Sequence, residues 1–165
     1  MIGVLRIVGM VAGGAIVWVV VASQVPSHLK LPLASVVVGA VITQPFGCTS
    51  FELEPYDPFC PGRHLHTGID LAAAMGTPVH SATGGTARVG FDPDGAGLYV
   101  VVAVDSHVRA FYCHLSSVAV ITGKPVSAGD VIGGLGSSGN STGPHVHFEI
   151  QRDGTSIDPA VWLAS

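Results

Sequence analysis

Charged side chains, aromatic side chains and cysteines are all scarce in this sequence. Only 11% of the 165 residues are charged and 7% are aromatic, and the formal net charge is −4. This shortage of positive charge excludes the basic face that binds nucleic acid, so we expect no nucleic-acid partner. The three cysteines match no zinc-ribbon spacing, which excludes a structural zinc site of that kind.

Glycine and proline, by contrast, are abundant, with 22 and 11 residues respectively. This composition favours many turns and short strands over long amphipathic helices. Residues 97–105 and 108–115 are apolar runs of β-forming residues. Two polar residues, Ser106 and His107, separate them, which predicts a hairpin. We therefore predict a mainly β fold, a small single domain of antiparallel sheets over residues 41–165, and we expect a monomer.

The N-terminus differs in composition from the rest of the chain. After Arg6 an uncharged, apolar run continues to Val25, which is long enough for a helix to cross a bilayer. We predict that residues 1–23 form an apolar helix, either a transmembrane anchor or a cleaved secretory signal. The weak small-residue cleavage site favours the anchor. Both alternatives deliver the downstream domain outside the cytoplasm, and residues 24–40 are interpreted as a linker and lead-in.

A loop rich in glycine, proline and aromatic residues, 46–63, carries a cysteine near each end. In an oxidising compartment Cys48 and Cys60 can pair, which would stabilise the fold by roughly 2–3 kcal/mol in the chain-entropy model. The alternative is that both remain unpaired thiols. Strand alternation predicts that Cys113 points away from His114 and is a small core residue.

The stretch from His145 to Ile150 alternates strictly between polar and apolar residues. A period of two predicts a half-buried strand, with His145, His147 and Glu149 on one face. Two imidazoles two residues apart can point into the same small volume, as a metal site requires. The alternative is a surface strand that carries two exposed histidines.

A second group of ligand-type residues lies in the HxxxD stretch that begins at His66 and ends at Asp70. Imidazole nitrogen and carboxylate oxygen are both good Zn²⁺ donors, and Gly68 between them allows the backbone to turn. One further histidine from the strand at 145–150 completes a set of two histidines and one carboxylate. Three protein ligands leave the fourth tetrahedral position for water, as in catalytic zinc sites.

Three segments together resemble a known family: HTGIDLAAAMGTPV, then FYCHLS, then GLGSSGNSTGPHVHFEI. They are similar to the LytM/lysostaphin-type zinc endopeptidases of the M23 family, which cut peptide bonds in bacterial peptidoglycan. The resemblance covers residues 41–158. It implies antiparallel sheets that form an open groove, a peptidoglycan peptide as the substrate, and a location at the cell wall or in the periplasm.

The resemblance also implies a role for each matching residue. His66, Asp70 and His147 would bind one Zn²⁺ per chain, and His114 and His145 would be the catalytic histidines. One imidazole would accept a proton from water and the other would stabilise the oxyanion. Which of the two is the base stays open. The alternative function is a non-catalytic M23-like module that binds the cell wall or activates another hydrolase.

Three neighbouring residues have open assignments. Tyr112, two residues before His114, is either a core aromatic or part of the cleft. Glu149 either orients a ligand imidazole or is a solvated charge at the rim. His64 forms a rival HxH pattern with His66, but the spacing to the carboxylate favours a position at the rim.

Overall fold

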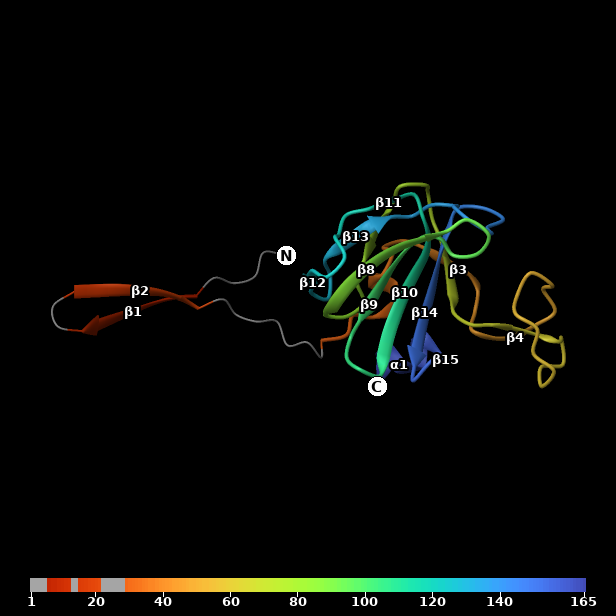
Figure 1. Cartoon of the computed structure of the whole chain (residues 1–165), viewed down its shortest axis with the longest axis horizontal. Helices are drawn as coiled ribbons and strands as arrows, with labels where there is room; N and C mark the ends of the chain where they lie inside the picture. Colours follow the sequence, from red (N-terminus) through yellow and green to blue (C-terminus); the bar gives the residue numbers. More distant parts are fainter. Residues whose placement is uncertain (1–5, 13–14, 22–28) are drawn as a thin grey trace.

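The computed structural model describes residues 6–12, 15–21 and 29–165. The body of the molecule is built on an eight-stranded sheet in the order β12-β8-β9-β10-β14-β6-β3, with β15 paired to β14 (Figure 1). Every strand pair among the described residues is antiparallel. The predicted mainly β fold is therefore confirmed. These eight strands are β3 (Val41–Gln44), β6 (Ile69–Ala72), β8 (Gly85–Asp92), β9 (Gly97–Ala103), β10 (Val108–Leu115), β12 (Pro125–Val126), β14 (His145–Arg152) and β15 (Thr155–Ile157).

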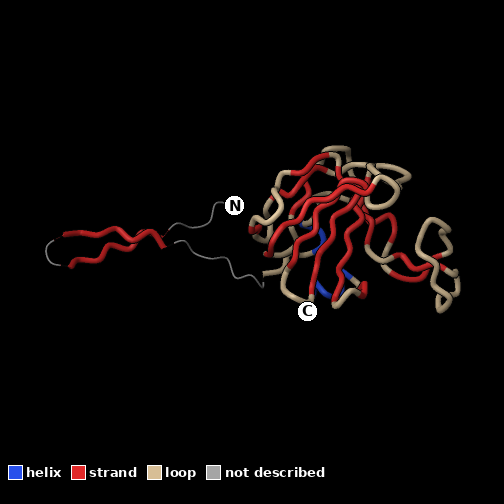
Figure 2. The backbone as a smooth tube through the Cα atoms, in the orientation of Figure 1, coloured by secondary structure: helices blue, strands red, loops and turns tan. Residues whose placement is uncertain are grey.

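Smaller elements surround this sheet, and Figure 2 shows how little of the chain is helical. A three-stranded sheet has the order β11-β13-β7, and β4 pairs with β5 in a separate hairpin. The bounds of these elements are η1 (Leu33–Ser35), β4 (Gly47–Thr49), β5 (His64–His66), β7 (Pro78–His80), β11 (Ser117–Val118), β13 (Val131–Gly134) and α1 (Pro159–Ala164).

One face of the large sheet packs into the hydrophobic core. In β14 the alternate residues Val146, Phe148 and Ile150 are fully buried, as the period of two predicts. Tyr112 of β10 is also fully buried, its ring lies 5.1 Å from that of Phe148, and its hydroxyl accepts a hydrogen bond from the backbone of Ala82 at 2.7 Å. Tyr112 is therefore a core residue.

The regular alternation of β10 ends at His114. Its φ of 62° lies in the left-handed region, and the register between β10 and β9 shifts between Tyr112 and Leu115. Backbone hydrogen bonds hold this conformation, because the His114 N–H donates to the Ala96 carbonyl at 2.8 Å. Cys113 is buried as predicted, but it faces the groove beside His114 rather than the core. The prediction that it points away from His114 is wrong, because the strand irregularity breaks the alternation there.

Part of the predicted lead-in belongs to the folded body. Val36 and Val37 are buried in the core, and the Val36 carbonyl accepts a hydrogen bond from His80 at 2.8 Å. Lys30 reaches the C-terminus, where its ammonium donates to the Trp162 carbonyl at 2.8 Å. Lys30, Val36 and Val37 of this stretch therefore contact the folded body.

Replacing Val36 by Ala is expected to lower the free energy of unfolding by about 2 kcal/mol, since two buried methyl groups are lost. Val38 provides a matched control because its side chain is 67% exposed. Val38→Ala should change the stability by less than about 0.5 kcal/mol. Urea unfolding of the full chain measures both values, and equal effects of the two substitutions would contradict the packing described above.

The apolar N-terminal helix is not found in the described residues. Arg6–Ala12 (β1) and Ala15–Val21 (β2) instead pair as antiparallel strands, with Arg6 opposite Val21. Most residues of these strands are valine or isoleucine, whose branched Cβ favours the extended backbone over the helix. The remainder of the predicted segment lies outside the described residues. No helix in the described ranges has both the length and the apolar character needed to cross a membrane.

The hairpin of β4 and β5 carries a disulfide. Cys48 and Cys60 are bonded, with their Cα atoms 5.2 Å apart, and Cys113 is a free, buried thiol. The disulfide closes the segment that contains Phe51 and Leu53, which line one side of the groove described next. The predicted pairing of Cys48 with Cys60 is present in the structure.

Candidate active site

The HxxxD segment and the HxH strand meet through the pairing of β6 with β14. In this register Asp70 lies directly opposite His147, and His66 enters from the end of β5. Gly68 makes the close approach feasible. A Cβ at this position would lie 2.5 Å from the Phe148 carbonyl oxygen and 2.8 Å from the His147 ring. Only glycine allows the turn between His66 and Asp70 to pack this closely against β14.

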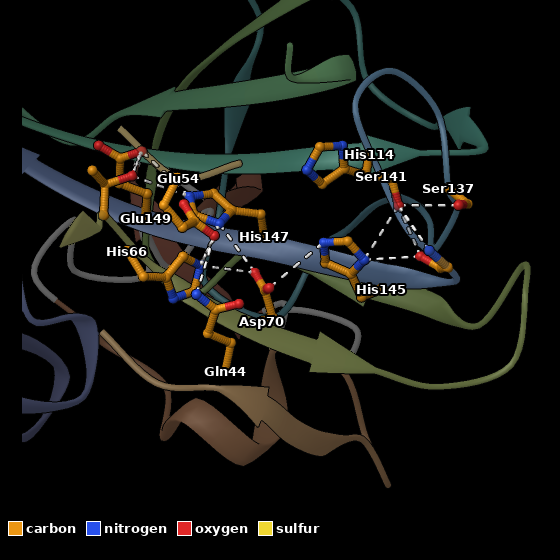
Figure 3. Close-up of polar contacts among 12 residues, drawn as sticks. Gln44, Glu54, His66, Asp70, His114, Ser137, Ser141, His145, His147 and Glu149 are labelled. Atoms are coloured by element: carbon orange, nitrogen blue, oxygen red, sulfur yellow. Dashed lines mark hydrogen bonds and ion pairs between the residues drawn. The ribbon is translucent and has the colours of Figure 1, made fainter. Parts of the chain in front are cut away.

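Three side-chain atoms converge at this point, as Figure 3 shows. His66 Nε2 lies 3.1 Å from Asp70 Oδ1 and 3.0 Å from His147 Nδ1, and His147 Nδ1 lies 3.1 Å from Asp70 Oδ1. Tetrahedral Zn²⁺ with ligands about 2.0–2.1 Å away holds its ligand atoms roughly 3.3 Å apart. The donor set and its spacing therefore fit a zinc ion, and these three residues could hold one.

The hydrogen bonds around the cluster also favour a cation. His66 Nδ1 donates to the Pro45 carbonyl at 2.9 Å, which leaves a lone pair on Nε2 directed at the Asp70 carboxylate. Two acceptors at this distance repel each other unless a proton or a cation lies between them. A neutral His66 imidazole is therefore stable in this position only with a positive charge between its Nε2 and the Asp70 carboxylate.

The pKa values of Asp70 and His147 are both shifted by the hydrogen bonds between imidazoles and carboxylates in the cluster. Burial acts to raise the pKa of Asp70, but hydrogen bonds with His147 and His66 outweigh it and hold this pKa well below its usual range. Burial acts to lower the pKa of His147, but hydrogen bonds with Asp70 and Glu149 outweigh it and raise the pKa to about 9. Both shifts reflect a site that stabilises positive charge next to Asp70.

Glu149 supports the other side of the His147 ring. Its Oε2 lies 3.5 Å from His147 Nε2 and accepts a hydrogen bond from Thr67 Oγ1 at 3.1 Å. Its Oε1 accepts hydrogen bonds from Gln151 at 2.7 Å and Ser156 at 2.6 Å. Only 9% of Glu149 is exposed, so it is not a solvated rim charge. Its position instead fits a residue that orients the His147 imidazole.

Replacing Glu149 by Gln is expected to weaken zinc binding about 10- to 100-fold, because the carboxylate fixes the orientation of the His147 imidazole. The measurement is a competitive titration of zinc against a chromogenic chelator. Glu52, an exposed acidic residue of the loop 46–63, provides the control substitution Glu52→Gln. Equal zinc affinity of the two variants would contradict this function of Glu149.

The two histidines predicted to be catalytic lie together beside the cluster. The rings of His114 and His145 are 4.8 Å apart, and His145 Nε2 lies 3.8 Å from Asp70 Oδ2. Each ring donates its Nδ1 hydrogen to a backbone carbonyl at 2.8 Å, His114 to Ser138 and His145 to Gly143. Burial lowers the pKa of His114. The hydrogen bonds leave Nε2 of each neutral imidazole free to accept a proton.

The cluster opens into a groove with a volume of about 250 Å³. Phe51 and Leu53 of the disulfide-closed loop line it, and the segments around Ala96 and Asn140 contribute the other lining residues. The predicted open groove is therefore present. Four of the five predicted site residues line it, and His66 lies buried behind Asp70 and His147.

Sequence analysis missed Glu54 and Gln44. The Gln44 amide donates to Glu54 Oε1 at 3.1 Å, and this oxygen lies 4.0 Å from His66 Nε2. Neither residue belongs to a spaced motif, so the only signal was their position near the cysteine-bounded loop. His64 lies outside the cluster, where its Nδ1 bonds to the Glu54 carbonyl at 2.7 Å.

Comparisons with known proteins agree with this geometry. The profile of Peptidase family M23 matches residues 64–159. Peptidoglycan DD-endopeptidase ShyA of Vibrio cholerae is 39% identical over 93 residues, which are 56% of this chain and 22% of ShyA. The chain spans about 22% of the length of the curated relatives that it matches.

Two solved structures share the fold. The catalytic domain of lysostaphin from Staphylococcus simulans has a TM-score of 0.63 at 32% identity, covering 76% of this chain and 93% of that one. A zinc-containing peptidase from Vibrio cholerae has a TM-score of 0.62 at 33% identity, covering 73% and 36%. The resemblance drawn from three short segments of the sequence is confirmed, and the chain belongs to Peptidase family M23, with relatives of the LytM/lysostaphin type.

Proposed function

We propose that this protein is a zinc-dependent endopeptidase that hydrolyses peptide bonds in bacterial peptidoglycan. The observation that carries the proposal is the convergence of His66 Nε2, Asp70 Oδ1 and His147 Nδ1 within 3.1 Å of one another. Family membership supports a hydrolase that acts on the cell wall, since ShyA is named a peptidoglycan DD-endopeptidase.

In this proposal His66, Asp70 and His147 hold one Zn²⁺ per chain. When bound, Zn²⁺ polarises the scissile carbonyl and lowers the pKa of water towards 7. The protein orients the three ligands through the Pro45 carbonyl at His66 and the Glu149 carboxylate at His147. Three ligands from the chain leave room for a substrate or water oxygen.

His114 and His145 would share the proton transfer and the stabilisation of the oxyanion. One imidazole, neutral, accepts a proton at Nε2 from the attacking water and passes it to the nitrogen of the leaving amine as the C–N bond breaks. The other imidazole, protonated at Nε2, donates a hydrogen bond to the oxyanion that forms at the scissile carbonyl. The fixed Nδ1–carbonyl hydrogen bonds of both rings support this division, because they hold each Nε2 in a set direction. Which of the two is the base stays a prediction to be tested.

The site of action and the domain limits are also proposals. The chain would act outside the cytoplasm, at the cell wall or in the periplasm, where its substrate lies, and the Cys48–Cys60 disulfide fits an oxidising compartment. The peptidase unit would comprise residues 30–165, since Val36 and Val37 belong to its core. Membrane association of residues 1–23 and the monomeric state stay predictions.

The test uses the purified full chain and a peptidoglycan suspension. We expect close to one bound zinc per chain, clearing of the suspension, and release of new amino termini. A chelator should stop the release, and added Zn²⁺ should restore it. Release that persists in the metal-free protein would contradict the proposal. A protein that binds the wall but releases no amino termini would support the non-catalytic module instead.

A further inference from the structure

The sheet face that carries the cluster extends beyond it into a second cavity. This cavity has a volume of about 580 Å³ and lies over β8, β9 and β10, which run side by side next to β14 in Figure 1. Ala96 lines both this cavity and the groove at the cluster. The two cavities therefore adjoin at Ala96.

The strand register places two arginines in this second cavity. One row of paired residues crosses the four strands from β14 to β8. Its members, in the order β14, β10, β9 and β8, are Glu149, Phe111, Val101 and Arg88. In the next row Gln151 of β14 pairs with Arg109 of β10. Directly paired residues share a sheet face, so Arg88 and Arg109 lie on the face that carries His147 and Glu149.

Both guanidinium groups are available to a ligand. Arg88 and Arg109 are exposed, and neither forms an ion pair within residues 29–165, although acidic residues outnumber basic ones in the chain. Two aspartates, Asp92 and Asp105, also line the cavity and remain charged, but neither is paired with Arg88 or Arg109 among residues 29–165, and Oδ1 of each accepts backbone hydrogen bonds of its own turn. Asp92 Oδ1 accepts a backbone hydrogen bond at 3.2 Å, and Asp105 Oδ1 accepts two at 2.7 and 2.8 Å.

An apolar floor lies between the two arginines. Val101, Ala103 and Phe111 form it, and Tyr99 lies beside it in the next row towards the cluster. The Tyr99 ring lies across β8 at Gly90, where a Cβ would meet the tyrosine hydroxyl at 2.3 Å. A flat apolar surface between two planar cations suits an extended peptide that carries a carboxylate, because guanidinium groups bind carboxylates with two parallel hydrogen bonds.

The register also sets the distance of this cavity from the cluster. Arg109 pairs with Gln151, four residues along β14 from His147, or roughly 13 Å at about 3.3 Å per residue. Arg88 lies three strands from β14 and in the row of Glu149, two residues from His147, or roughly 16 Å at about 4.8 Å per strand and 3.3 Å per residue. An extended peptide covers these distances with about four to five residues.

We propose that the cavity between Arg88 and Arg109 is a subsite for a carboxylate of the peptidoglycan peptide, about four to five residues from the bond that is cleaved. The inference rests on the proposed function for the position of the scissile bond. It adds a preference for acidic over amidated peptides. The two arginines act by binding and positioning the substrate, and they take no part in the proton transfers.

The first arm of the test measures binding alone, so that it does not depend on hydrolysis. The full-length protein is titrated calorimetrically with a soluble peptidoglycan fragment whose carboxylates are free and with the same fragment after amidation. The wild type should bind the free acid about tenfold more tightly, and Arg88→Gln with Arg109→Gln should reduce this ratio to about one. The double substitution to Lys should retain part of the preference, because the charge remains.

The second arm compares rates of release of new amino termini from untreated and amidated peptidoglycan. Arg152 lies on the other face of β14, so Arg152→Gln should keep the wild-type ratio. Equal affinity of the wild type for both fragments, or an unchanged ratio in the double Gln variant, would overturn the subsite. Loss of all hydrolysis with the binding preference intact would instead contradict the proposed endopeptidase and leave the subsite supported.

Discussion

Replacing His147 by Ala is expected to abolish zinc binding and hydrolysis together, whereas replacing His114 by Ala is expected to slow hydrolysis strongly and leave zinc binding intact. His147 Nδ1 is one of the three converging donor atoms, and two remaining ligands bind zinc far more weakly. The His114 ring lies 6.3 Å from the His147 ring and contributes no atom to the cluster. Loss of a group that transfers a proton or stabilises the oxyanion should slow the reaction about 10²- to 10⁴-fold.

Metal content per chain and the rate of amino-terminus release separate these two outcomes. His107 offers a matched control, since it is an exposed histidine whose Nδ1 lies 2.6 Å from Asp153 Oδ1 at the protein surface. His107→Ala should retain zinc and activity. A His114→Ala protein that lyses normally, or a His147→Ala protein that retains one tightly bound zinc, would overturn the assignment of the corresponding residue.

Replacing Gly68 by Ala is expected to disrupt the cluster although it changes no ligand. The added Cβ would lie 2.5 Å from a backbone oxygen of β14 and 2.8 Å from the His147 ring, so the turn at Gly68 must move away from β14 or the ring must turn. Such overpacking costs roughly 1–3 kcal/mol, and displacement of the ring should weaken zinc binding by at least about tenfold.

Gly143 is the control for this substitution. A Cβ at Gly143 meets no atom within 4 Å, and the residue still offers its carbonyl to His145. Zinc titration and thermal unfolding of both variants in the full chain provide the comparison. A Gly68→Ala protein with the zinc affinity and melting temperature of Gly143→Ala would contradict the close approach of the two segments.

Local sequence patterns succeeded where neighbouring residues determine the structure. Alternation in β14 predicted its buried and groove-facing residues because successive side chains of a strand point to opposite faces. The same rule failed at His114, because its left-handed backbone brings its side chain to the groove that Cys113 also lines. Alternation also could not distinguish a helix from strands within residues 1–23. An apolar run is compatible both with a membrane helix and with the paired strands β1 and β2.

The sequence by itself determined the family, because the HxxxD and HxH spacings and the segments around them are those of Peptidase family M23, and the same segments supplied five candidate site residues. Only the tertiary structure decided which atoms converge. Asp70 and His147 are separated by 77 positions in the chain, and the register of β6 against β14 brings them to 3.1 Å. It also decided that Glu149 lies against His147 and that Arg88 and Arg109 share the groove face. The physical reason is that hydrogen bonds across the whole sheet set the register between distant strands, whereas spacing along the chain reports only on neighbours.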